Sequence, residues 1–98
     1  MVTMTINFKE EKLKELGYTA EQLLGQFDEY CSANDILKPQ LNVFEKDGIH
    51  ALADISKIIF EIEKNVWFLN LLDKWYWNID GKIEDILEDA YYWSKRLN

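Results

Sequence analysis

The chain has 98 residues, of which 48% are hydrophobic and 30% are charged. This composition is typical of a folded domain and unlike that of a disordered chain, so we expect a single domain over residues 1–98. The formal net charge of −7 repels nucleic-acid phosphates and anionic membranes, which argues against a protein that binds either of them directly.

Two further features of the chain bear on its location. Cys31 is the only cysteine, so no internal disulfide can form, and this usage suits a reducing compartment. The N-terminal segment lacks the basic leader and apolar run of a signal peptide, and no stretch reaches the roughly 18 apolar residues of a membrane span. We therefore expect a cytoplasmic protein without a membrane segment.

The first predicted elements are a strand and two helices. Alternating apolar residues predict a strand over residues 2–8 with one buried face. Charged and apolar residues at helical spacing predict a short helix over residues 9–16. A second helix, over residues 20–34, begins after Thr19, whose spacing from Gln22 fits a capping box.

The middle of the chain contains the longest predicted helix. A short apolar run predicts a strand over residues 41–45, and the helix that follows covers residues 48–64, with Asp47 as its N-cap. Apolar residues occupy two sides of this helix, one rich in isoleucine and the other carrying Ile49 and Phe60. A helix that is apolar on two sides is usually packed between two layers, so we expect it at the centre of the fold.

The last third of the chain holds all four tryptophans and many carboxylates. Its predicted elements are a helix over residues 66–73, a third candidate strand over residues 75–79, and a helix over residues 81–97. Strand periodicity places Trp75 and Trp77 on the inner face and Tyr76 on the outer one. Helical periodicity places Trp93 on the inward side of the last helix.

These elements predict a helix-dominated α+β fold, in which a small antiparallel sheet packs against helices. The main alternative is an all-α fold with an extended N-terminal arm. No internal repeat, low-complexity tract or linker divides the chain into parts.

No group of residues in the chain predicts an enzyme, a bound cofactor or a metal. The phosphate-binding glycine motifs, the nucleophile elbow and the zinc-binding helix motif are all missing from the sequence. His50 lies one helical turn from Asp54, and such a pair can share a proton or contribute to a metal site. Because charges of both signs alternate along the same side of the helix, we interpret the pair as part of a solvated face. Cys31 lies on an apolar stripe and is predicted to pack in the core.

The candidate binding surface is an acidic arc on the last predicted helix. Carboxylates there could steer a basic partner, and exposed tyrosines could anchor it. Acidic residues early in the helix, with Lys95 and Arg96 near its end, also match the helix dipole, which is a purely structural explanation of the same pattern. The predicted partner-binding residues are Glu84, Asp85, Glu88, Asp89, Tyr92 and, from the preceding strand, Tyr76.

The sequence therefore predicts a small acidic interaction protein with no catalytic residues and no cofactor. Its expected partner is a protein with a basic surface, including one that itself binds nucleic acid and that the carboxylates would block by mimicking phosphates. Antitoxins, immunity proteins and phage anti-defence proteins are inhibitors of this class, found in phages and mobile elements. The alternatives are a homo-oligomeric structural protein, a homodimer being the simplest form, and a minor metal-binding enzyme that uses His50 and Asp54.

Overall fold

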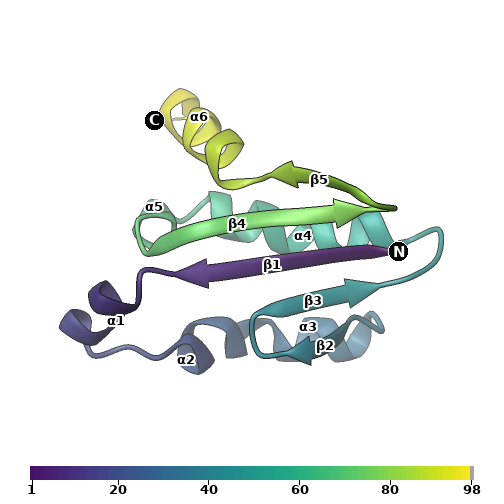
Figure 1. Cartoon of the computed structure of the whole chain (residues 1–98), viewed down its shortest axis with the longest axis horizontal. Coiled ribbons are helices and arrows are strands. Elements are labelled where there is room, and N and C mark those ends of the chain that lie inside the picture. The colour runs from purple at the N-terminus through teal and green to yellow at the C-terminus, as the bar shows by residue number, and fades with distance from the viewer. Residues whose placement is uncertain (98) are drawn as a thin grey trace.

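The chain folds into a five-stranded sheet whose one face is covered by helices, as the computed structural model in Figure 1 shows. The structure describes the backbone of residues 1–97 and the side chains of residues 1–92. With 48% of the chain helical and 29% in strands, the α+β prediction is confirmed, although the chain is less dominated by helices than we expected. The all-α alternative is wrong, because strands pair along the whole width of the sheet.

The strands are β1 (Val2–Phe8), β2 (Leu37–Gln40), β3 (Val43–Lys46), β4 (Leu72–Ile79) and β5 (Lys82–Asp85). The helices are α1 (Glu10–Leu16), α2 (Ala20–Leu24), the 3-10 helix η1 (Gly25–Phe27), α3 (Asp28–Ala33), α4 (Ala51–Glu63), α5 (Val66–Leu69) and α6 (Leu87–Leu97). The strand order is β2-β3-β1-β4-β5, and each neighbouring pair is antiparallel. The first strand therefore lies in the middle of the sheet, and β5 lies at one edge.

The inner face of the sheet forms one side of the core. Met4 of β1 pairs with Phe44 of β3 on one side and with Trp77 of β4 on the other. Ile6 of β1 pairs with Trp75 of β4, which is only 1% exposed. The period-2 prediction for β1 and the inward direction of Trp75 and Trp77 are confirmed, with Trp77 half-buried at the margin of the core.

The long helix α4 packs on the sheet with one side only. Its buried residues include Ile55, Ile58 and Ile62, whereas Ile49, just before the helix, is 93% exposed and Phe60 is 58% exposed. The prediction that this helix lies between two layers is therefore wrong, since no second layer among the described residues covers its outer side. The sheet covers one side of α4, and neighbouring helices lie beside it rather than over it.

Several predicted boundaries needed correction around α4 and before it. The helix expected over residues 48–64 begins at Ala51, because Gly48 adopts a left-handed backbone (φ 96°) and His50, rather than Asp47, is the N-cap. The helix expected over residues 20–34 is divided by η1. Its capping box is confirmed: the Thr19 hydroxyl accepts from the Gln22 amide at 3.2 Å, and the Gln22 side chain accepts from the Thr19 amide at 2.9 Å.

The last third of the chain differs most from the prediction. The helix expected over residues 66–73 ends at Leu69, and the chain re-enters the sheet at Leu72 as β4. The helix expected over residues 81–97 begins only at Leu87, because the preceding residues form the edge strand β5. The prediction for Trp93 concerns a side chain outside the described residues, as do those for Lys95 and Arg96.

A two-residue turn joins β4 to β5 and explains why a strand follows it. Asp80 and Gly81 both have positive φ, 51° and 94°, which is the backbone geometry that continues the twist of two antiparallel strands. The Asn78 side chain accepts from the Gly81 amide at 2.7 Å and holds the turn.

The helices were also compared with the requirements of a membrane span. Among the described residues, none of them combines the length and the apolar character that such a span needs.

Candidate functional site

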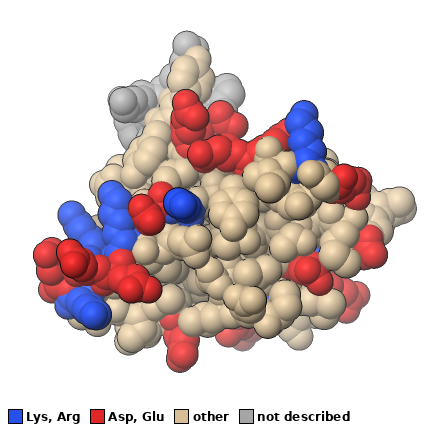
Figure 2. All heavy atoms as spheres, in the orientation of Figure 1, with Lys and Arg blue, Asp and Glu red and all other residues tan. Residues whose placement is uncertain are grey.

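Four carboxylates lie where β5 passes into α6. Glu84 and Asp85 are the last two residues of β5, and Glu88 and Asp89 belong to the first turn of α6. All four are exposed, and we call them the acidic corner. Figure 2 shows acidic side chains gathered beside α6 at the upper edge of the molecule.

The acidic corner is not the single helical arc that the sequence predicts. Because β5 is a strand, Glu84 and Asp85 point to opposite faces of the sheet. Asp85 is the cross-strand partner of Tyr76, on the face without helices. Glu84 is the partner of Trp77, whose indole nitrogen donates to the Glu84 carboxylate at 3.4 Å. The structure therefore brings Tyr76 and Asp85 together and separates Asp85 from Glu84.

Two of the corner carboxylates also have structural contacts. The Asp85 carboxylate accepts from the Glu88 amide at 3.3 Å, which satisfies a free donor at the start of α6. Lys82 forms an exposed ion pair with Glu84 at 3.6 Å, and pairs of this kind contribute little to stability. Among residues 1–92, Lys82 is the one cation paired with the acidic corner, so negative charge remains in excess there.

A fifth carboxylate, Glu63 at the end of α4, lies close to the corner. Burial raises the pKa of Glu63, and the negative charge of Asp89 raises it further. A like charge nearby makes a carboxyl group hold its proton more readily. Asp89 therefore lies close enough to Glu63 for its negative charge to act on that carboxyl group.

Tyr92, the remaining predicted residue on α6, lies on the same side of the helix as the corner residues. It is 52% exposed and follows Glu88 and Asp89 by four and three positions, a spacing that makes these residues surface neighbours on a helix. The neighbouring residue Tyr91 is half-buried, and its hydroxyl donates to the main-chain oxygen of Leu69 at 3.0 Å. This bond fastens α6 to α5.

The face of the sheet opposite the helices is uncovered, and we call it the open face. Figure 2 looks onto it and shows a centre almost free of charged side chains, with charge at the margins. Antiparallel sheets often have one solvated face, on which single apolar side chains are normal and contiguous apolar patches are rare. Leu37 and Ile83, on the two edge strands, are 63% and 66% exposed. By strand register the open face includes Thr3, Thr5, Val43, Tyr76, Asn78 and Ile83.

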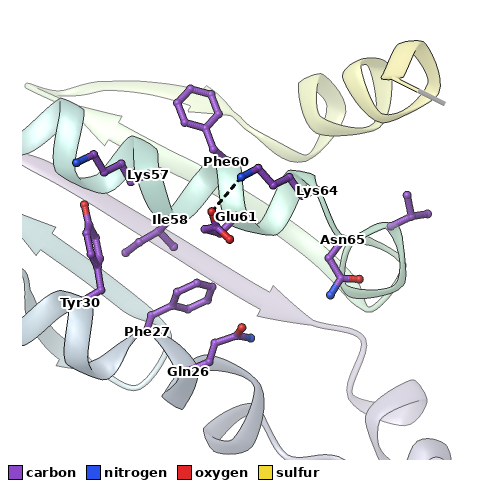
Figure 3. A pocket seen from close by; sticks show the side chains of 10 residues that line it. Gln26, Phe27, Tyr30, Lys57, Ile58, Phe60, Glu61, Lys64 and Asn65 are labelled. Carbon is purple, nitrogen blue, oxygen red and sulfur yellow. Dashed lines mark hydrogen bonds and ion pairs between the residues drawn. The ribbon is translucent and has the colours of Figure 1, made fainter.

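A groove of about 850 Å³ lies on the helix side, between α4 and the segments η1 and α3 (Figure 3). Its apolar floor includes the buried residues Phe27 and Ile58. Two of the polar groups along it have partners within the fold: the Tyr30 hydroxyl donates to a main-chain oxygen of α4 at 2.6 Å, and Lys64 pairs with Glu61 at 3.1 Å. Among residues 1–92, Lys57 is the one lysine of the groove without an ion pair. A small-molecule site needs convergent polar groups that are available to a ligand, and this groove does not gather them.

The second predicted site, His50 with Asp54, is built differently from what the sequence suggests. The Asp54 carboxylate is 16% exposed and accepts from the Lys46 ammonium at 2.6 Å, so it is not part of a solvated face. This hydrogen bond lowers the pKa of Asp54. Asp54 therefore ties α4 to β3. Within residues 1–92, no group of three or more His, Cys, Asp or Glu residues is arranged to hold a metal ion.

Cys31 is buried in the core, as predicted, and burial raises the pKa of its thiol.

Sequence reasoning missed the open face and the part that Ile83 has in it. Ile83 falls within the helix expected over residues 81–97, where its spacing from later apolar residues would turn it inward, but in the strand it is 66% exposed. The signal that could have found this is the Asp80–Gly81 pair between two short apolar runs, which favours a hairpin.

The candidate site thus consists of the acidic corner, bordered by Tyr76 on the open face and by Tyr92 on α6. Such a surface can attract cations and cover a flat partner. Comparison of the chain with protein-family models, with curated proteins and with solved structures gives no match.

Proposed function

We propose that this chain is a small protein-interaction module that binds a basic surface of a protein partner and blocks it. The observation that supports this most is the acidic corner, where four exposed carboxylates face solvent with one lysine paired to them among residues 1–92. A concentration of negative charge at one place raises the rate at which a basic partner arrives and selects against acidic ones.

Two tyrosines give this surface the means to hold a partner after it has arrived. Tyr76 borders the corner on the open face beside Asp85, and Tyr92 borders it on α6. Tyrosine combines a large apolar area with a hydroxyl and is enriched among residues that dominate binding energy. A partner that covers both would contact the end of the sheet and the first turns of α6 together.

The inhibitory part of the proposal follows from the kind of surface that is attracted. A basic protein surface commonly binds nucleic acid, and a row of carboxylates competes for the same lysines and arginines. We therefore place the chain with inhibitors such as antitoxins, immunity proteins or phage anti-defence proteins. The single buried cysteine suits action in the cytoplasm.

Three versions of the protein test the proposal. The first is the natural chain, and the second neutralises the corner with Glu84→Gln, Glu88→Gln and Asp89→Asn. The third, a matched control, removes the same number of charges from the exposed side of α1 with Glu10→Gln, Glu11→Gln and Glu15→Gln. Immobilised in turn, they are exposed to lysate of the native host, and the bound proteins are identified at low and high salt.

We expect one basic protein to be retained by the natural chain and by the α1 control, and to be lost from the corner variant and at high salt. Equal retention by the corner variant would contradict the proposed site. Retention of a partner that high salt does not release would contradict the electrostatic mechanism.

Self-association is the second candidate function, and the exposed apolar side chains of the open face favour it. Leu37 and Ile83 lie on this face, which no helix of the described chain covers. In the sheet register Glu45, Thr3 and Asn78 lie between them, so they are two separate apolar positions that a second copy could cover. Light scattering across a range of protein concentrations decides: a strict monomer at high concentration rejects this candidate.

A further inference from the structure

The backbone of β5 has hydrogen-bonding groups that point away from the sheet. The turn at residues 80–81 makes Ile79 and Lys82 a directly hydrogen-bonded pair. The Ile86 amide donates to the Trp75 oxygen at 2.8 Å, which shows that even-numbered residues keep facing β4 beyond the strand. Because the two directions alternate along a strand, the amide and carbonyl groups of Ile83 and Asp85 point outward.

These outward groups have no strand to pair with in the part of the chain that the structure describes. Strand β5 has β4 as its one neighbour, and its four residues are all exposed. The opposite edge of the sheet differs, because Pro39 lies within β2 and removes a donor there. An exposed edge that keeps its donors and acceptors is a template for one more strand.

We propose that β5 binds an extended, basic segment of the partner as a sixth strand of the sheet. This inference rests on the proposed function and adds the manner of binding. Main-chain hydrogen bonds at Ile83 and Asp85 hold the segment, and carboxylates on both sides of the strand select its charge.

The side chains of β5 determine which residues the bound segment needs at each position. On the open face, Ile83 offers an apolar surface and Asp85 a carboxylate. On the helix side, Glu84 lies next to the start of α6, with Asp89 and Glu63 beyond it. Cross-strand neighbours of opposite charge stabilise a sheet and like charges destabilise it. The segment therefore has lysine or arginine opposite Glu84 and Asp85 and an apolar residue opposite Ile83.

The charge distribution also favours this occupant over a second copy of the chain. Each copy has a formal net charge of −7, and edge-to-edge pairing of two β5 strands would bring two acidic corners together. Acidic side chains on an edge strand are a common protection against such self-pairing. A basic segment turns the same charges into attraction.

Amide hydrogen exchange on the full chain, followed by NMR, tests the proposal with a defined probe. The probe is a capped peptide of two Lys-Lys-Val repeats, about six residues long, as a typical strand is. Saturating peptide should slow exchange at Ile83 and Asp85, by about tenfold when its concentration is about nine times Kd. Exchange at Lys82 and Glu84, which already bond to β4, should stay unchanged.

Two controls separate strand addition from simple charge attraction. A peptide of the same sequence with N-methylated backbone amides keeps the charge but cannot pair along the edge. Ile83→Pro removes the outward amide of β5 at a position where an edge strand tolerates proline, and Ile83→Val keeps that amide. We expect protection by the unmodified peptide in the natural chain and in the valine variant, but not with the methylated peptide or in the proline variant.

Each other outcome overturns a defined part of the account. Chemical-shift changes around Glu88 and Asp89 with both peptides, without protection at Ile83 and Asp85, would overturn strand addition and leave the proposed function standing. No response of the corner to either peptide would overturn both. Concentration-dependent protection of Ile83 in the protein alone would show that a second copy occupies the edge, which also overturns the proposal. The methylated-peptide comparison uses the natural chain, so it remains decisive if the proline variant fails to fold.

Discussion

Asp54 and Glu63 are carboxylates of the same helix whose pKa values shift in opposite directions. The hydrogen bond from Lys46 lowers the pKa of Asp54, whereas burial and the charge of Asp89 raise the pKa of Glu63. A pKa that differs between the folded and unfolded chain makes stability depend on pH. The two residues therefore contribute pH dependence of opposite sign.

Replacing Asp54 with asparagine should destabilise the fold at neutral pH and have little effect in acid. Because the folded-state pKa is lowered, the stabilisation is fully present above the unfolded value of about 3.9 and is lost as pH falls through the folded value. Urea unfolding of Asp54→Asn and the natural chain, measured from neutral pH into acid, should give free energies of unfolding that converge. Asp73→Asn, at an exposed position of β4, serves as the control. If the free energies of unfolding of Asp54→Asn and the natural chain differed by the same amount at every pH, this would contradict the role of the Lys46 contact.

Glu63→Gln should have the opposite effect and stabilise the fold at neutral pH. Ionised Glu63 is disfavoured in the folded state, so its cost is present above the raised folded-state pKa and disappears as pH falls to the unfolded value of about 4.3. Thermal unfolding should show a higher Tm for the variant at pH 7 and equal Tm values in acid. A lower Tm for the variant at pH 7 would mean that Glu63 has a stabilising contact that outweighs its burial and its proximity to Asp89.

Residue-level contacts between elements are the part of this fold that the sequence could not predict. The spacing of His50 and Asp54 is visible in the sequence, but the actual partner of Asp54 is Lys46, which depends on how β3 lies beside α4. The capping box of Thr19 and Gln22 was predicted correctly, because it depends only on neighbouring residues. Contacts within one turn can be inferred from order along the chain, and contacts between elements cannot.

At the scale of elements, the β4–β5 hairpin decides what the acidic corner looks like. Residues 83, 86, 87 and 90 have a helical spacing of apolar side chains, which favoured one long helix. The turn at Asp80 and Gly81 instead directs the chain back along β4, and pairing with that strand outweighs the local helical pattern. The strand β2 was not predicted because it contains Pro39. Proline is compatible with an edge strand, but its presence generally argues against a strand.

Gly81→Ala tests the hairpin. Gly81 has φ +94°, where a side chain is strained, so the substitution should cost about 1–2 kcal/mol in the free energy of unfolding. Gly25→Ala is the matched control, because Gly25 has φ −60° and an added Cβ would meet its nearest neighbour, the Asp28 carboxylate, at 3.8 Å. Urea unfolding should show this control to be neutral or more stable by up to about 1 kcal/mol. Equal effects of the two substitutions would contradict the left-handed turn and, with it, the position of β5.

At the scale of the whole molecule, the fold separates two surfaces. Helices cover one face of the sheet and leave the open face bare, while the edge at β5 continues into an acidic helix (Figures 1 and 2). The sequence identified the four corner carboxylates and the two tyrosines as candidates from charge and exposure alone. Which of them lie together depends on the pairing of Tyr76 with Asp85, which only the folded sheet determines.

The central claim is that the acidic corner attracts a basic partner, and association kinetics test it most directly. Once the retained partner is identified, its association rate with the natural chain, the corner variant and the α1 control is measured as a function of salt. We expect the corner variant to associate about tenfold or more slowly at low salt, with a flatter salt dependence, because steering by local charge raises association rates by 10-fold to about 1,000-fold. The α1 control should behave much like the natural chain. Equal slowing of both variants would show that only net charge matters, and it would contradict a binding site at the corner.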